Sequence, residues 1–310
     1  MLVLMNPRCN GGGAGKRWPA VRAAVQRLRP DAQFAEPDSA ADAERVVAAA
    51  VAAGHDAIVT AGGDGTVNLA LNVLMDPASD RPRAPGVALG AIGLGSSNDF
   101  HKPNVGGRLL AGAPARVDVD GATAVDVGKA TIQLPGGGRL VRYFLLNASM
   151  GMVADGNNAF NTGGGLVKWL KPRNVDLAIA VCAAQVVAAL RLPQVAIGSS
   201  DWHYDGPVAN VGVLKSVYFA GGMHYDTAVA DDDGQFDVNI WRAAGRLAIC
   251  RLVFGLYRGH FLASPLAISH RCDAVELMPR SPCALELDGE IVVAQAARLD
   301  VIRGPLKVCA

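Results

Sequence analysis

Residues 57–75 constrain the fold of this chain more than any other segment. The apolar run Ala57–Ala61 predicts a buried strand, which passes through the glycine turn Gly62–Gly65 into a predicted helix over Thr66–Met75. A strand that leads through a short turn into a helix is the unit from which parallel sheets are built. The first part of the chain is therefore expected to form a parallel sheet with helices packed against it.

The rest of the first 125 residues repeats this alternation. Leu2–Met5 and Val87–Ile92 are further predicted strands, and helices are predicted around Pro19–Arg29 and over Ser39–Ala53, the latter with Ser39 as its N-cap. Residues 77–86 form a predicted Pro-rich surface loop. These elements indicate a doubly wound α/β domain.

From about residue 117 the pattern changes to β-branched and aromatic runs separated by Gly, Asp and Pro. Such runs predict the strands of a mainly antiparallel domain. Two helices interrupt them, over Val175–Leu192 and Ala243–Phe261, and the last run, LDVIRGPLKV, predicts a strand that can pack on either domain. We therefore expect domains over 1–122 and 123–295, with a C-terminal strand or tail over 296–310.

Composition excludes several classes of protein. The 29 basic and 28 acidic residues leave a net charge of +1, without the basic excess of a nucleic-acid-binding protein. The six cysteines show no C-x-x-C pair, which favours a reducing compartment, and no signal-peptide pattern precedes Pro7. The apolar segment Leu177–Leu190 is shorter than the ~20 residues that span a bilayer. We expect a cytoplasmic protein without a membrane anchor.

Two glycine loops carry the strongest chemical signal. Gly62 and Gly63 let backbone N–H groups approach an anion, and the helix that follows adds its dipole. Asp64 would repel a bare phosphate, so it indicates a metal-bridged phosphate or a proton acceptor, or else it only shapes a tight turn. The loop Gly93–Phe100 has the same build, and the carboxyl ends of neighbouring parallel strands are where doubly wound sheets bind ligands.

A third loop, NPRCNGGGAGK over Asn6–Lys16, does not fit the Walker pattern, because Asn10 and Arg17 stand where Gly and Ser or Thr are required. The acidic cluster before Gly234 is not an EF-hand either, because Val229 and Ile240 would occupy the first and last ligand positions. Neither segment therefore has a function that its motif alone defines.

In order and spacing, NPRCNGGG, GGDGTVN, GLGSSNDF, FAGGMHYDTAVADDDGQFDV and ELDGE resemble the bacterial diacylglycerol kinase and lipid kinase family, which is related to sphingosine and ceramide kinases. GGDGT alone is shared with NAD kinases. The resemblance implies an N-terminal Rossmann-like domain, a C-terminal β-sandwich and an ATP site in the cleft between them. It implies transfer of the γ-phosphate of ATP to the hydroxyl of a lipid such as diacylglycerol, with Mg²⁺ as cofactor.

The resemblance also assigns residues to roles. It places ATP against three loops, at Asn6, Pro7, Arg8, Cys9, Asn10, Gly62, Gly63, Asp64, Gly65, Thr66, Asn68, Gly95, Ser96 and Asn98. It makes Asp288 or Glu290 the base that accepts the proton of the acceptor hydroxyl. Asp64 is a further catalytic candidate, either as a ligand of Mg²⁺ or as a proton acceptor. It places a structural Mg²⁺ on Asp233 and the carbonyls of Ala230 and Gln235, for which a solvated acidic turn is an equal alternative.

Some residues depart from the family pattern. Leu69 stands where the family usually has Glu, and Pro37 where it commonly has Thr; His101 and Lys102 are added beside the predicted phosphate site. These departures keep two alternatives open: a kinase of a soluble acceptor such as NAD, or a catalytically silent nucleotide- or lipid-binding protein. A homodimer and peripheral contact with the inner face of the membrane are both compatible with the sequence.

Overall fold

A computed structural model describes residues 1–102, 107–170 and 173–310, and the chain divides into two compact units. Unit 1 comprises Met1–Asp126 and Arg303–Ala310, and unit 2 comprises Val127–Ile302. Two strands, β9 (Thr123–Gln133) and β21 (Ala296–Val308), each contribute residues to both units. The last strand therefore belongs to both parts of the chain.

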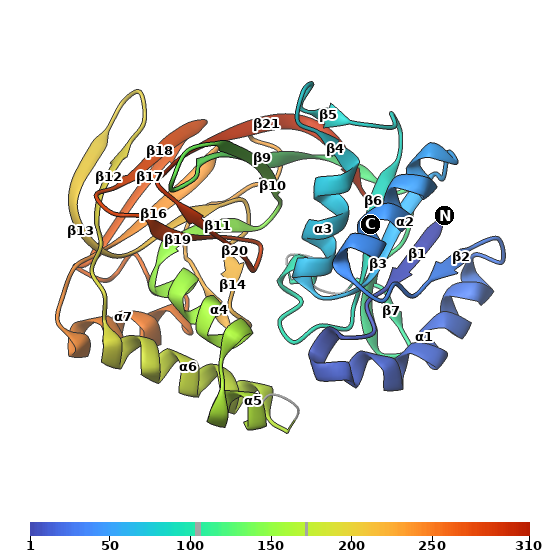
Figure 1. The fold of residues 1–310 in the computed structure, drawn as a ribbon, viewed down its shortest axis with the longest axis horizontal. Coiled ribbons are helices and arrows are strands. Elements are labelled where there is room, and N and C mark those ends of the chain that lie inside the picture. Colours follow the sequence, from blue (N-terminus) through green and yellow to red (C-terminus); the bar gives the residue numbers. More distant parts are fainter. Residues whose placement is uncertain (103–106, 171–172) are drawn as a thin grey trace. The chain divides into compact units, whose positions relative to one another are not determined.

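Unit 1 contains the predicted parallel sheet (Figure 1). Its parallel strands lie in the order β2 (Gln33–Ala35), β1 (Leu2–Met5), β3 (Ala57–Gly62) and β6 (Ala88–Gly93). Beside β6, the end of β21 pairs in parallel and β8 (Ala113–Arg116) pairs antiparallel, and the short β7 (Leu109–Leu110) pairs with β8. All residues of β1, β3 and β6 are buried, as expected of a sheet covered on both faces.

Helices cover both faces of this sheet. α1 (Gly13–Leu28) packs on one face, and α2 (Ala40–Ala52) and α3 (Asp64–Leu74) on the other. α1 begins earlier than the predicted Pro19 because Ala14, Trp18, Val21 and Val25 form one continuous buried stripe. The N-cap prediction at Ser39 is confirmed, since its hydroxyl accepts a hydrogen bond from the Asp42 N–H at 3.2 Å.

Short elements complete unit 1. The 3₁₀ turns η1 (Cys9–Gly12) and η2 (Asp99–His101) follow β1 and β6. The predicted loop over 77–86 contains part of a small hairpin made by β4 (Met75–Asp76) and β5 (Arg81–Pro82).

Unit 2 is built from antiparallel strands, as predicted. One sheet has the order β20 (Glu290–Ala294), β19 (Cys283–Leu287), β11 (Asn147–Gly151), β13 (His203–Leu214), β16 (Phe236–Arg242) and β17 (Ala267–Cys272). The first half of β13 continues into a second sheet with β12 (Gln194–Gly198), β18 (Ala274–Pro279), β21, β9 and β10 (Arg139–Phe144). The short strands β14 (Tyr218–Phe219) and β15 (Met223–His224) pair separately.

One hydrophobic core joins side chains from both sheets of unit 2. Phe144 of β10 stacks on Phe236 of β16 with ring centroids 5.7 Å apart. Gly128 makes room for Phe144, because a Cβ at this position would lie 2.3 Å from the ring. This packing fixes the sheets on which the acidic turns of unit 2 are mounted.

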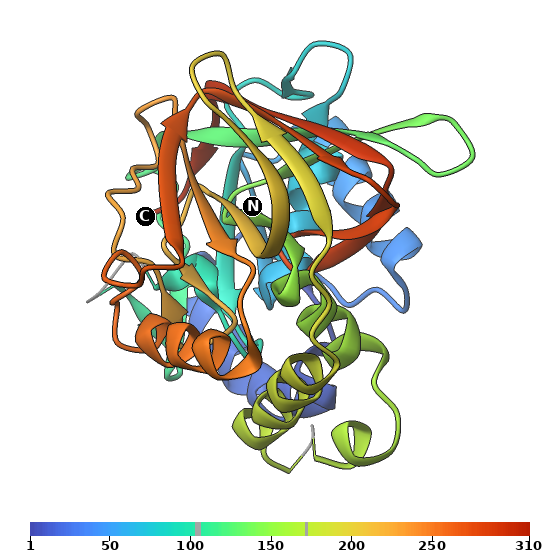
Figure 2. The same ribbon diagram turned by 90° about the vertical axis from the view of Figure 1, so that its left-hand side faces the viewer.

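In the described part of unit 2, α4 (Met152–Thr162), α5 (Gly165–Leu170) and α6 (Val175–Ala189) lie between β11 and β12, and α7 (Arg246–Leu256) lies between β16 and β17. Figures 1 and 2 both show α6 and α7 side by side at one end of the unit. A second apolar cluster, centred on Trp241, Tyr225 and Phe261, packs beneath α4, α6 and α7. The sequence predicted α6 and α7, with longer limits, but not α4 or α5.

Candidate functional site

The glycine loops of unit 1 lie together at one edge of the parallel sheet. β1, β3 and β6 are parallel neighbours, so the segments that follow them emerge at the same edge. These segments are residues 6–10, 62–68 and 93–98, which contain every predicted nucleotide-binding residue. The topology therefore brings the three predicted loops to one place.

Asn6 ties the first loop to the second. Its Nδ2 donates to Oγ1 of Thr66 at 3.0 Å, and its backbone N–H donates to the Ala61 carbonyl at 2.9 Å. Its Oδ1 accepts from the N–H of Arg8 at 3.1 Å. The hydrogen bond between Asn6 and Thr66 thus holds the first two loops together.

Gly63 and Gly95 bring the second and third loops into backbone contact. A Cβ on Gly95 would lie 2.5 Å from the Gly63 Cα, and a Cβ on Gly63 would lie 3.2 Å from the Gly95 Cα. The N–H groups of Leu94 and Gly95 donate to the Gly62 carbonyl at 2.8 and 3.1 Å. The Asn98 side chain closes the third loop by accepting from Gly95 N and donating to Gly95 O. Only glycine permits this approach.

Asp64 also joins the second and third loops. Its Oδ2 accepts from the Asp99 N–H at 3.1 Å and its Oδ1 from the Phe100 N–H at 3.0 Å. Both carboxylate oxygens therefore hold the start of η2. Of the roles that the sequence left open for Asp64, these contacts are nearest to the shaping of a turn. The link to the third loop was not predicted.

Two helix N-termini open at these loops, which suits an anion. Asn10, Gly11 and Gly12 have left-handed φ values of 52°, 60° and 87° and lead into α1, and α3 begins directly after Gly63. Helix N-termini and glycine-rich backbone bind phosphate through N–H groups and the helix dipole. Arg8, Asn10 and Ser96 are exposed, whereas Pro7 and Gly65 are half-buried. The residues present therefore fit a nucleotide phosphate.

Two of the residues predicted to contact the nucleotide, Cys9 and Asn68, are engaged within the protein. Burial raises the pKa of the Cys9 thiol to about 11, so it stays protonated at neutral pH. Asn68 is buried in α3, where its Oδ1 accepts from Nδ2 of Asn72 at 3.0 Å. Cys9 contributes packing, and Asn68 bonds along its own helix.

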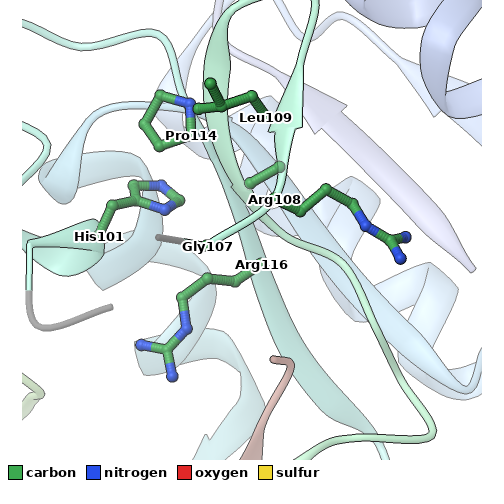
Figure 3. A pocket seen from close by; sticks show the side chains of 7 residues that line it. His101, Gly107, Arg108, Leu109, Pro114 and Arg116 are labelled. Atoms are coloured by element: carbon green, nitrogen blue, oxygen red, sulfur yellow. The ribbon is translucent and has the colours of Figure 1, made fainter. Parts of the chain in front are cut away.

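A pocket of about 210 Å³ lies beside η2, lined by His101, Gly107, Arg108, Leu109, Pro114, Ala115 and Arg116 (Figure 3). His101 is buried, and burial together with the Arg116 charge lowers its pKa to about 4. It is therefore neutral at physiological pH, and the Lys102 ammonium pairs with Asp99. His101 and Lys102, the two residues that depart from the family pattern here, therefore do not provide two free positive charges for a phosphate.

In unit 2, Asp288 and Gly289 form the two-residue turn between β19 and β20, with left-handed φ values of 48° and 93°. The Asp288 carboxylate is buried and accepts from the N–H groups of Leu145, Leu146 and Asn147 at 2.8, 2.9 and 3.1 Å. Glu290, two residues later, is exposed. Of the two predicted bases, Asp288 holds the β10–β11 connection and Glu290 faces solvent.

The acidic turn, residues 230–235, does not fit the predicted metal ion. Nζ of Lys215 donates to the carbonyls of Ala230 and Gln235 at 2.8 and 3.2 Å and lies 3.5 Å from Oδ1 of Asp233. These are the three oxygens expected to hold Mg²⁺, and the ammonium, only 1 % exposed, takes the cation position. Asp233 also pairs with Arg271. Among the residues that the structure describes, no three His, Cys, Asp or Glu side chains are grouped to hold a metal.

Lys215 is the site residue that the sequence did not reveal. It directly follows the run NVGVL that ends β13, where a lysine indicates only the end of a strand. Lys215 contacts residues that lie 15 to 20 positions later in the sequence, so no local sequence motif predicted the contact.

The chain thus combines an α/β unit that has glycine loops at the carboxyl edge of its sheet with an antiparallel β unit. Residues 1–130 match the family model described as diacylglycerol kinase catalytic domain. Residues 152–310 match the model described as YegS C-terminal NAD kinase beta sandwich-like domain. The chain therefore belongs to the diacylglycerol kinase and YegS-like lipid kinase family.

Relatives and solved structures agree with this assignment. The chain is 28 % identical over 291 residues to a Pseudomonas fluorescens protein named "Probable lipid kinase YegS-like", covering 93 % of this chain and 89 % of the other. It is 25 % identical to a Staphylococcus aureus diacylglycerol kinase, covering 82 % and 72 %. A crystal structure of a Bacillus anthracis diacylglycerol kinase shares the fold with a TM-score of 0.69 at 18 % identity, over 99 % and 95 % of the chains.

A more distant structure, yeast NADH kinase in complex with NADH, superposes with a TM-score of 0.51 at 9 % identity and covers 100 % of this chain and 83 % of the other. It extends the likeness of fold to an NADH kinase. In the part of the chain described, no helix is both long and apolar enough to cross a bilayer.

Proposed function

We propose that this protein is a lipid kinase that transfers the γ-phosphate of MgATP to a lipid hydroxyl, with diacylglycerol or a related lipid as acceptor. The observation that carries the proposal is the backbone contact of Gly63 with Gly95, because it holds the glycine loops that follow β3 and β6 together beside the N-terminus of α3, where a phosphate can bind. Membership of a lipid kinase family supports the choice of acceptor.

In this proposal the three loops of unit 1 hold ATP. Asn6 and Thr66 keep the first two loops in register, and Asp64 keeps the third loop against the second. Mg²⁺ bound to the nucleotide neutralises charge on the phosphates. The chain's own contribution is to position the phosphates through backbone N–H groups, which is the main requirement for phosphoryl transfer.

The acceptor side of the reaction is assigned to the turn of residues 288–290. The alcohol oxygen forms the new bond to the γ-phosphorus, the bond to ADP breaks, and Glu290 accepts the hydroxyl proton. Asp288 fixes the turn through its three N–H donors, and Asn161 of α4 donates to the Gly289 carbonyl at 3.3 Å. Glu290 is assigned as the proton acceptor because both carboxylate oxygens of Asp288 already accept backbone N–H groups, whereas the Glu290 side chain is exposed and can reach an acceptor.

The test is transfer of labelled γ-phosphate from MgATP to mixed micelles of diacylglycerol, ceramide, sphingosine or polyprenol, with NAD as a soluble acceptor in parallel. We expect label in a lipid. Label in NAD alone would replace the lipid by a soluble acceptor, and ATP binding without transfer would indicate a silent nucleotide-binding protein.

Two glycine variants make the assay specific for the loops. Gly95→Ala forces a Cβ against the Gly63 backbone and should weaken ATP binding at least about tenfold. Gly15→Ala is the matched control, because a Cβ there, in the first turn of α1, meets nothing within 4 Å. Equal ATP affinity of the two variants would remove the Gly63–Gly95 contact from nucleotide binding.

A further inference from the structure

Helix α6 lies at the surface, but from Leu177 to its end at Ala189 it carries no charged residue. Residues 177–190 contain neither acidic nor basic side chains. Nevertheless Leu177 is 49 % exposed, and the alanines at 180, 183, 184, 188 and 189 are also exposed, with Gln185 as the one polar side chain among them. A helix that is apolar on all sides is normally buried in protein or lipid. Part of the surface of α6 is therefore suited to contact with protein or lipid.

The helices that contact α6 also expose apolar side chains. α5 exposes Leu166 and Trp169 at 55 % each, and α7 exposes Leu247 at 67 % and Phe254 at 57 %. Tyr257 and Leu262, just after α7, are also about half exposed. The helical face is defined here as Leu166, Trp169, Leu177, Leu247, Phe254, Tyr257 and Leu262. Both views show α6 and α7 along the same end of unit 2 (Figures 1 and 2).

Basic residues outnumber acidic ones around the helical face. Arg246 and Arg251 belong to α7, Arg258 follows it, and Lys168, Arg173 and Arg191 lie in or beside α5 and α6. Among the acidic residues, Asp176 belongs to α6, and the Asp226 carboxylate is occupied by the N–H groups of Phe261 and Leu262 at 3.0 Å. On α7 the exposed residues Leu247, Arg251 and Phe254 follow one another at helical spacing, and the exposed Arg258 comes two residues after the helix. The chain as a whole carries only +1, so this concentration of cations is local.

Specific contacts hold this surface in shape. Arg246 of α7 donates from Nη2 to the Ala188 carbonyl at 2.9 Å and so fastens the end of α6 to α7. The Arg173 and Arg258 guanidinium groups lie over the Trp169 and Phe254 rings, 4.5 and 4.2 Å from their centroids. Each pair presents an aromatic ring and a cation together, the combination found at membrane interfaces.

We propose that the helical face docks on a bilayer surface that carries anionic phosphate headgroups. Apolar helices with Arg on their rims and Trp, Phe and Leu on their outer side bind in the interface plane, by apolar burial and by attraction to anionic lipids. A second copy of the chain is the weaker occupant, because a symmetric pairing would bring the same arginines together, and the Asp226 carboxylate beside them already accepts two backbone N–H groups. This docking surface would bring the proposed lipid kinase to the membrane that holds its substrate. Its biological role therefore rests on the proposed function, whereas the binding to vesicles does not.

The test is flotation of the full chain with vesicles of phosphatidylcholine alone or mixed with phosphatidylglycerol. We expect binding to the anionic vesicles, weaker binding to phosphatidylcholine, and release as salt is raised. The double variant Trp169→Ser with Phe254→Ser should lose at least about tenfold in affinity, because it removes two interfacial aromatic anchors. Met278→Ser is the matched control, since Met278 is 49 % exposed on β18 of the same unit.

Three results would overturn the proposal: no binding of the wild-type chain to anionic vesicles, equal loss in the Met278→Ser control, or wild-type affinity in the double variant. Sedimentation velocity of each variant tests the second occupant. A dimer that the double variant abolishes, without vesicle binding, would assign the face to a partner copy.

Transfer of phosphate to a short-chain diacylglycerol dispersed in water separates this proposal from the proposed function. Transfer without vesicle binding would overturn the docking surface and leave the kinase intact. Vesicle binding without transfer to any lipid would support the docking surface and overturn the kinase.

Discussion

Unit 2 contains two turns that combine aspartate with glycine, and the groups that meet their carboxylates differ. At Asp288–Gly289 three backbone N–H groups from the β10–β11 connection meet the carboxylate. In the acidic turn the Lys215 ammonium meets two carbonyls and the Asp233 carboxylate. The first turn is held by neutral donors and the second by a cation supplied by the chain itself.

This difference shows that an acidic turn does not by its own composition specify a metal ion. Mg²⁺ requires oxygen ligands, and the acidic turn offers them, but an ammonium with three N–H donors satisfies the same oxygens. The amino acid at the end of β13 therefore decides which cation the turn holds. The predictions below test each turn by removing the group on which it depends.

Replacing Asp288 with Ala should have the largest effect on stability. The change leaves three buried N–H groups without their acceptor, each costing ~1–3 kcal/mol. Because such costs are not additive, we expect a loss of about 4 kcal/mol in the free energy of unfolding. Urea denaturation measures it.

Glu290→Gln is the matched control for Asp288→Ala, since Glu290 lies two residues away and is exposed. It should change stability by less than about 0.5 kcal/mol while lowering kcat about 10²-fold or more under the proposed mechanism. Equal stability of the two variants would contradict the role of Asp288 in holding the turn, and unchanged kcat in Glu290→Gln would remove it as the base.

The turn at Asp288 and the acidic turn also show why sequence reasoning succeeded in one place and not in another. The strand–glycine–helix order of residues 57–75 is local, so the parallel sheet, its loops and the Ser39 cap could be predicted. The Asp-Gly hairpin is local as well. The Lys215 contact is not, because β13 meets the acidic turn only after the sheet has formed.

Two helices of unit 2 were missed for a related reason. α4 contains Gly156, Asn157, Asn158 and Asn161, which are weak helix formers. Its buried residues Met152, Val153 and Ala154 stabilise it by packing rather than by propensity. Tertiary contacts therefore override the local signal here, as they do at the early start of α1.

Replacing Lys215 with Met should have the second largest effect, a loss of about 3 kcal/mol in the free energy of unfolding, because it leaves two carbonyls without their donor and the Asp233 carboxylate with Arg271 as its remaining cation. The smaller variant Lys215→Ala also leaves space for an ion. We expect Mg²⁺ to raise the Tm of Lys215→Ala but not that of the wild-type protein, measured without nucleotide.

The response to Mg²⁺ decides between the two kinds of cation. If Mg²⁺ stabilises the wild-type protein and EDTA reverses the effect, Lys215 does not replace a metal in this turn. If neither Lys215 variant responds to Mg²⁺ and both keep the wild-type Tm, the ammonium contributes nothing to the turn.

The smallest expected effect concerns Asp237, a buried carboxylate next to the acidic turn whose Oδ2 lies 3.9 Å from Nε of Arg271. Burial raises its pKa; Arg271 and Lys215 lower it, and Asp233 raises it, with a net rise. Because the folded-state pKa lies above the unfolded one, the ionised form costs stability at higher pH, and that cost disappears as the pH falls through the folded pKa and below the unfolded one.

Asp237→Asn should therefore stabilise the protein by at most about 1 kcal/mol at pH 8, with no gain at low pH. Urea unfolding across this pH range measures it, and Asp205→Asn, at an exposed position of β13, should show no such dependence. A gain in Asp237→Asn that persists at low pH would point to packing instead. A loss of stability at pH 8 would mean that the Arg271 and Lys215 charges outweigh burial, and that the acidic turn shares its cations with Asp237.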